Sequence, residues 1–125
     1  MKSKLFLFGL SAALAAPTMA DVTVNITGAT AFREAALLAI LDLYTPGTVR
    51  YVHDGAAGQF QLSSEATFVG TVSGVAGTTT IRTAFNGSLE GLNAITSTSL
   101  TQQPLYIPAS AVPATGAFGE RGVGI

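Results

Sequence analysis

The sequence contains no cysteine, no tryptophan and a single histidine, His53. Without cysteine, the chain cannot be a small secreted domain held together by disulfides, and a zinc site with thiolate ligands is excluded. One imidazole cannot build a multi-histidine metal centre within one chain, so we expect neither a metal nor another cofactor. The stability of the folded domain must therefore come from packing alone.

Charge is also scarce, because charged residues make up only 10% of the sequence. Both lysines lie within the first four residues. From Asp21 onward the chain has four arginines and seven acidic residues, a net charge of −3. Binding to nucleic acid needs a basic surface, and binding to an anionic membrane needs clustered Lys and Arg, so neither function is expected.

The amino terminus has the pattern of a bacterial signal peptide. Two lysines precede an apolar run at residues 5–16, and residues 18–20 carry small side chains at the two positions that a signal peptidase reads. The run is shorter than the roughly 20 residues that cross a bilayer as a helix. We expect export and removal of residues 1–20, which leaves a mature chain of 105 residues in the periplasm or on the cell surface. No stable membrane insertion is expected after cleavage.

The mature chain begins with a strand-to-helix pattern. Residues 21–27 alternate between apolar and polar side chains, which is typical of a strand. Gly28 is expected to permit a turn that a larger residue would strain, and the Thr30 hydroxyl to cap the next helix. Residues 31–44 predict that helix, and because they carry only three charges we expect it to be largely buried.

The middle of the chain predicts further strands and a second strand-to-helix turn. A short strand is expected over residues 49–53 and a loop over residues 56–64. Residues 67–72 and 78–85 flank a loop of about five residues and predict a β-hairpin. Residues 86–88, with the sequence Asn-Gly-Ser, then lead into a short helix whose apolar side chains are Leu89, Leu92 and Ile95.

The pattern weakens after residue 100, where prolines and then glycines become frequent. Residues 105–107 could form one short strand. We take residues 21–100 as an α/β lobe and residues 101–125 as a Pro/Gly-rich segment. That segment is expected to continue into a longer protein; the alternative is a disordered tail.

Both strand-to-helix turns place a glycine and a hydroxyl residue at the start of a helix. In an open α/β sheet, ligands bind beyond the carboxyl ends of the strands, where a helix N-terminus offers unpaired amides and about half a positive charge. The two turns are predicted to converge into an anion site, to which Arg33 could add a guanidinium. The alternative is ordinary helix capping at each turn. The candidate ligand-binding residues are Gly28, Ala29, Thr30, Arg33, Gly87, Ser88 and Leu89.

The order of these motifs resembles the first lobe of type 2 periplasmic solute-binding proteins, and the phosphate-binding members are the most similar in style. The matching residues are Gly28, Ala29, Thr30 and Phe32 in the first turn, then Gly87, Ser88 and Gly91 in the second. The resemblance covers residues 22–96, although Leu89 replaces a small residue and Glu90 adds a carboxylate. It implies a partial periplasmic-binding-protein-like lobe: a mixed sheet with two or three helices and a β-hairpin. It also implies an oxyanion such as phosphate as ligand, and a membrane transporter as partner.

Signals of an enzyme are weak. Residues 86–90 lack the glycines of a nucleophile elbow, and no lysine follows Gly28 or Gly87 as in a Walker phosphate loop. His53 and Asp54 are adjacent on a strand, so their side chains point to opposite faces and make a poor dyad. The sequence therefore predicts an exported solute-binding protein, or its amino-terminal fragment, without enzymatic activity. The rival interpretation is a structural or adhesive cell-surface protein with no small-molecule ligand.

Overall fold

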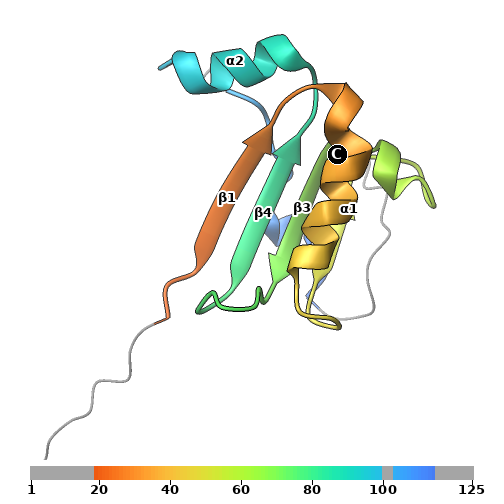
Figure 1. Cartoon of the computed structure of the whole chain (residues 1–125), viewed down its shortest axis with the longest axis vertical. Helices are drawn as coiled ribbons and strands as arrows, with labels where there is room; N and C mark the ends of the chain where they lie inside the picture. Colours follow the sequence, from red (N-terminus) through yellow and green to blue (C-terminus); the bar gives the residue numbers. More distant parts are fainter. Residues whose placement is uncertain (1–18, 100–102, 115–125) are drawn as a thin grey trace, which may run out of the picture.

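The structure is a computed structural model that describes residues 19–99 and 103–114 (Figure 1). It forms one mixed sheet of four strands in the order β1-β4-β3-β2, in which β1 is parallel to β4 and the other neighbours are antiparallel. The protein is thus a small α/β domain with a mixed sheet and a hairpin (β3–β4), as predicted; the predicted signal peptide lies outside the described residues. The elements are β1 (Val22–Thr27), α1 (Arg33–Leu43), β2 (Arg50–His53), β3 (Glu65–Gly70), β4 (Thr79–Ala84) and α2 (Ser88–Thr96).

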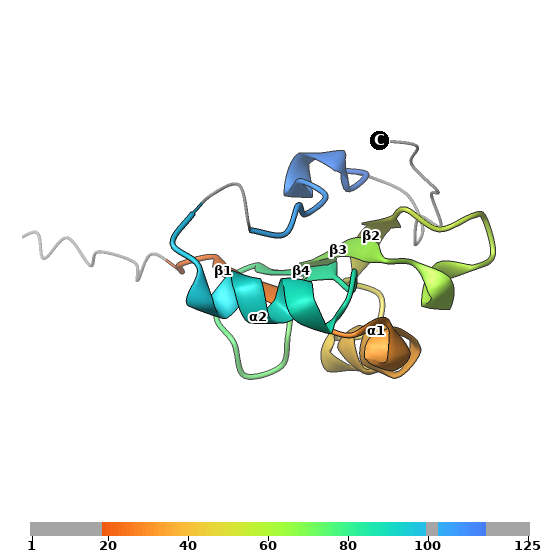
Figure 2. The same ribbon diagram turned by 90° about the horizontal axis from the view of Figure 1, so that it is seen from above.

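The main core lies between α1 and one face of the sheet (Figure 2). Alternate side chains of each strand point to this face. Val24 of β1, Ile81 of β4 and Phe68 of β3 are in register, so their side chains lie in one row on it. Leu37 and Ile40 close this core from α1. The buried members of the core are Leu37, Ile40, Tyr44, Val49, Tyr51, Phe60, Ala66, Phe68, Ile81 and Phe85.

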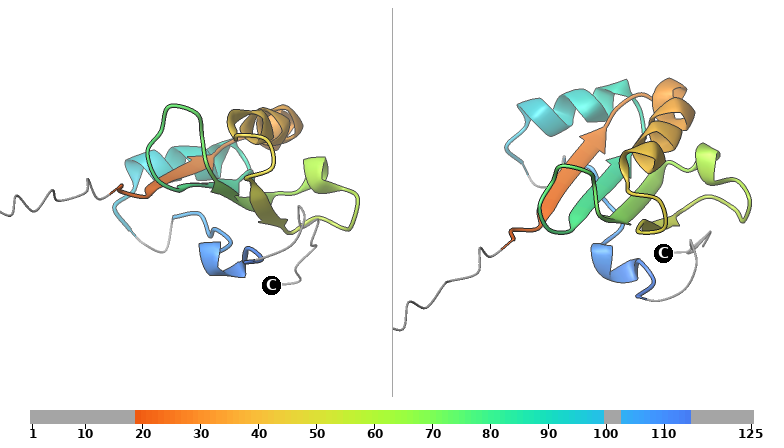
Figure 3. Two further views of the ribbon diagram at one scale, coloured as in Figure 1. Left: turned by 90° about the horizontal axis from the view of Figure 1, so that it is seen from below. Right: turned by 60° about the horizontal axis from the view of Figure 1, so that its bottom comes forward.

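Residues 103–114 lie over the β2 and β3 part of the opposite face of the sheet (Figures 2 and 3). Ile107 and Val112 pack there against Val52 of β2. The Thr67 hydroxyl donates a 2.6 Å hydrogen bond to the carbonyl of Ile107, and the Arg50 guanidinium donates to the carbonyl of Pro113. Residues 103–114, which belong to the predicted Pro/Gly-rich segment, therefore pack on the α/β lobe. Residues 105–107 do not form a strand, in contrast to the expectation from the sequence.

The prediction that the first helix is largely buried is wrong. Only Leu37 and Ile40 of α1 are buried, whereas Leu38 and Leu43 are about half exposed. The physical reason is that α1 packs on the sheet through one side, and the described residues place no second layer over its other sides (Figure 3). Low charge therefore does not by itself bury a helix.

The loop expected over residues 56–64 contains a 3₁₀ turn, Phe60–Leu62, that contributes to the core. The Phe60 ring is buried, with its centroid 4.9 Å from that of Tyr51 and 5.8 Å from that of Phe68. Strand β3 begins at Glu65, two residues earlier than predicted, because Glu65 pairs with Ala84 of β4; the Glu65 amide also donates to the Asp54 carboxylate at 3.0 Å. Asp54 is thus a turn residue, as expected.

Candidate functional site

The two strand-to-helix turns lie side by side. Because β1 and β4 are parallel neighbours, their carboxyl ends share one edge of the sheet, and both α1 and α2 begin there (Figure 1). The Gly87 amide donates to the Gly28 carbonyl at 3.2 Å, and the Gly28 amide donates to the Ala84 carbonyl at 3.3 Å. The structure thus brings together the two strand-to-helix turns, residues 27–33 and 86–91, which we call the rim. Whether the rim binds a ligand stays a prediction.

α2 packs closely on the β1–α1 connection through Gly91, a contact that the sequence did not predict. A Cβ placed on Gly91 would lie 3.3 Å from the Cα of Gly28, closer than side chains usually approach backbone. Gly91 therefore allows α2 to sit directly on the β1–α1 connection. From the sequence alone, this glycine offered only a reason to expect a weaker helix.

The prediction that the Thr30 hydroxyl caps the first helix is wrong, and the Ser88 hydroxyl does not cap the second helix either. The chain enters α1 through a 3₁₀ turn, Thr30–Phe32, whose N-cap is Ala29, and α2 is capped by Gly87. None of these helix starts has a side-chain cap hydrogen bond. Thr30 and Ser88 are instead exposed residues inside the first turns of their helices.

A backbone conformation that favours glycine occurs in the second strand-to-helix turn, at Gly87, and not in the first, at Gly28. Gly87 has φ +139° and ψ 163°, a region open essentially only to glycine. Gly28 has no positive φ, and a Cβ built on it would meet nothing within 4 Å. The expectation that Gly28 permits an otherwise strained turn is therefore wrong.

Several backbone donors of the rim are already used. The 3₁₀ turn pairs the Phe32 amide with the Ala29 carbonyl and the Arg33 amide with the Thr30 carbonyl. The amides of Gly28 and Gly87 are paired as described above. An α-helix leaves its first amides without partners in the helix, so the donors that remain come mainly from Ser88 and Leu89 in the first turn of α2.

Acidic groups lie on one side of the second turn. The Asn86 side-chain amide donates to the Glu90 carboxylate at 3.5 Å. Burial raises the pKa of Glu65, with smaller increases from Asp54 and Glu90, while its hydrogen bond with Asn86 acts in the opposite direction. By strand alternation Glu65 is on the same face as Thr67, which contacts Ile107, so these carboxylates belong to the face opposite α1.

Burial and the neighbouring Glu90 charge also raise the pKa of Tyr106, which places Glu90 close to the segment on that second face. An anion would therefore meet less repulsion if it approached the rim from the α1 side. Arg33, the first residue of α1, is half-buried, and its guanidinium has no ion-pair partner in the part of the chain that the structure describes.

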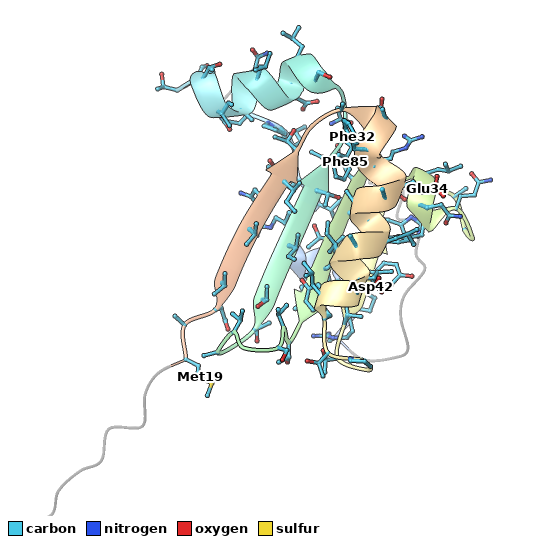
Figure 4. The ribbon with its side chains drawn as sticks, in the orientation of Figure 1. Met19, Phe32, Glu34, Asp42 and Phe85 are labelled. Carbon is cyan, nitrogen blue, oxygen red and sulfur yellow. The ribbon has the colours of Figure 1, made fainter. Side chains whose placement is uncertain are left out.

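The rim is an open surface. No pocket is found within residues 19–99 and 103–114. Two apolar side chains of the rim are exposed: Phe32, at the start of α1 (Figure 4), is 70% exposed, and Leu89, at the start of α2, is 72% exposed. Leu89, a predicted ligand-binding residue, can thus offer its backbone amide but no polar side chain.

A buried pair of His53 and Ser63 is the other chemically notable feature. The Ser63 hydroxyl lies 2.9 Å from His53 Nδ1, and both residues are buried. Without access for a substrate, this pair is best explained as part of the core. Gly55 makes room for it, because a Cβ there would lie 2.5 Å from the Ser63 hydroxyl. Nothing in the sequence pattern pointed to this contact.

Comparison with protein-family models, curated proteins and solved structures gives no match for this chain. Among the described residues, none of the helices combines the length and the apolar character required to cross a bilayer.

Proposed function

We propose that the protein is an exported solute-binding protein, or the amino-terminal part of one, that holds a small oxyanion such as phosphate at the rim. The observation that carries this proposal is the 3.2 Å hydrogen bond from the Gly87 amide to the Gly28 carbonyl, which joins the two strand-to-helix turns. Two helix starts at the carboxyl edge of parallel strands are where α/β proteins commonly bind anions.

The binding chemistry would be noncovalent. The amides of Ser88 and Leu89 and the positive end of α2 attract an anion, and the exposed hydroxyls of Ser88 and Thr30 donate to its oxygens. Arg33 adds a cation on the α1 side, away from Glu90. This donor set has no nucleophile paired with a base, which supports binding without catalysis.

Export and partnership belong to the same proposal. The leader at residues 1–20, which lies outside the described residues except at its end, would direct the chain to the periplasm or the cell surface. A solute-binding protein there delivers its ligand to a membrane transporter. The exposed Phe32 and Leu89 of the rim offer apolar area for such a partner, or for a second lobe.

Isothermal titration of the full-length protein with phosphate, sulfate and molybdate tests the proposal. We expect heat of binding with at least one of these anions. Thr30→Ala and Ser88→Ala should each weaken binding by about 1–3 kcal/mol, because each removes a donor to a charged ligand. Ser110→Ala is the matched control, since it removes an exposed hydroxyl on the opposite face of the sheet.

The second candidate function is a structural or adhesive surface protein. The exposed apolar side chains of α2, Leu92 and Ile95, favour it, because such surfaces mark contacts between proteins. A folded protein that gives no heat with any of the three anions would support this alternative. Binding that survives unchanged in both Thr30→Ala and Ser88→Ala would refute the rim as the site.

A further inference from the structure

The two edges of the sheet differ in how well they are protected. The β2 edge is short, four residues, and carries Arg50, which bonds to the segment that covers the second face. The β1 edge is six residues long and its sequence, VTVNIT, has neither a charge nor a proline. Proteins usually protect an edge strand with such residues, because an unprotected edge can pair with another strand.

The open edge of β1 presents a defined set of hydrogen-bonding groups. The Val22 amide donates to the Thr78 carbonyl at 2.9 Å, and the Gly28 amide donates to the Ala84 carbonyl. Since successive residues of a strand direct their backbone groups to opposite sides, the even-numbered residues pair with β4. The amides and carbonyls of Thr23 and Asn25 therefore point to the open edge, and no strand of the described chain pairs with them.

The side chains of β1 are divided between the two faces by the same alternation. Ile26 packs against the core on the α1 face, so Val22 and Val24 lie on that face as well, where they are 37% and 41% exposed. Figure 4 shows the carboxylates Glu34 and Asp42 of α1 on the side of the helix away from β1. The exposed valines thus form an apolar row with no charged residue in their strand.

We propose that this edge pairs with the same edge of a second copy of the chain, antiparallel and across a two-fold axis at Val24. In this register Val24 lies opposite Val24 of the second copy, and Val22 lies opposite its Ile26. The outward groups of Thr23 exchange hydrogen bonds with those of Asn25 in the second copy. The result is a continuous sheet through both copies, with the valine row on one face.

The strand pattern argues for a second copy as the occupant. β1 has apolar residues at its even positions and polar residues between them. The apolar and polar pattern of residues 22–26 is therefore symmetric about Val24. An antiparallel copy therefore matches apolar with apolar and polar with polar on each face. An interface of this kind, in which the same patch serves both subunits, closes as a dimer, and the absence of charge on β1 avoids like-charge repulsion at the axis.

Sedimentation velocity of the full chain, purified after export, tests the proposal over a range of protein concentrations. Wild type should sediment with twice the chain mass. Val24→Lys should raise the dimer dissociation constant at least about tenfold, because it places two ammonium groups directly opposite each other at the axis. Val24→Glu should do the same, and an equimolar mixture of the two variants should restore the dimer. Leu38→Lys, which changes an exposed apolar residue of α1, should remain dimeric.

A second variant, Asn25→Pro, tests the backbone pairing without changing the valine side chains. Asn25→Pro removes an outward amide and leaves the bonds of β1 to β4 in place, so it should be folded by circular dichroism and monomeric. In wild type, amide exchange at Asn25 should slow as protein concentration rises. A monomeric wild type, a dimer that persists in Asn25→Pro, or charge variants that do not pair when mixed would each overturn the proposal.

Discussion

At the scale of single residues, three glycines at the rim have different physical roles. Gly87 adopts a backbone conformation that side chains disfavour, and Gly91 allows α2 to approach the first turn. Gly28 meets neither condition. Because the residue is glycine at all three positions, the sequence alone could not distinguish these three roles.

Substitution of these glycines gives the first prediction. Gly87→Ala should lower the free energy of unfolding by about 1–3 kcal/mol, because alanine must take a backbone conformation open essentially only to glycine. Gly28→Ala is the matched control and should change stability little, since its Cβ meets nothing within 4 Å. Urea unfolding of the two variants measures the difference. Equal effects at both positions would contradict the backbone explanation.

Tyr44 gives a prediction for alkaline pH. Burial raises the pKa of Tyr44 to about 12, and its single O–H is shared between the carbonyls of Phe68 and Thr79, at 3.3 and 3.2 Å. The unfolded chain has the ordinary tyrosine pKa of about 10, so the folded state holds this proton more tightly. The stabilisation is therefore complete below pH 10 and is lost as the pH rises from about 10 through 12.

The variant Tyr44→Phe tests whether Tyr44 makes the protein less stable as the pH rises. At pH 8 the variant should be less stable than wild type by about 1 kcal/mol, because buried hydrogen bonds are lost. As the pH rises through the window from 10 to about 12, wild type should lose stability faster than the variant, so that the difference narrows. Urea unfolding across this pH range measures the difference in the free energy of unfolding between wild type and variant. A difference that stays constant up to pH 12 would show that Tyr44 does not titrate as its burial requires.

At the scale of elements, the strands and helices could be predicted because their patterns are local. Alternation identified β1 and β4, and the glycine turns located the starts of α1 and α2. The buried 3₁₀ turn at Phe60 and the early start of β3 could not be predicted, because both depend on contacts between distant residues, Tyr51 with Phe60 and Asp54 with Glu65. The exposure of α1 likewise depends on what packs against it.

The segment after α2 gives a prediction at this scale. Ile107 is 1% exposed and packs on the second face of the sheet, whereas Leu105 is 80% exposed. Ile107→Ala should lower the free energy of unfolding by about 2–5 kcal/mol, as expected for a large-to-small change in a core. Leu105→Ala should stay within about 0.5 kcal/mol of wild type. Equal stability of the two variants would mean that residues 103–114 do not belong to the folded domain.

At the scale of the whole molecule, the rim could be predicted but its donors could not. Two strand-to-helix turns imply neighbouring helix starts only if their strands are parallel and adjacent, as β1 and β4 are. Which amides remain available depends on pairing within the rim, where Gly28 and Gly87 bond to backbone groups and the 3₁₀ turn uses the amide of Arg33. The amides that remain available to the proposed ligand therefore belong mainly to α2.

That asymmetry gives a prediction for the stability of the whole protein. A ligand that binds only the folded state raises the free energy of unfolding, by about 2.7 kcal/mol at a concentration 100 times its dissociation constant. Phosphate should therefore raise the melting temperature, measured by calorimetry, while chloride at the same ionic strength should not. Ser88→Ala should need more phosphate for the same shift than Thr30→Ala, because Ser88 adds its hydroxyl beside the free amides of α2. Equal shifts with phosphate and chloride would show only general screening of charge, and a larger loss in Thr30→Ala would move the site towards α1.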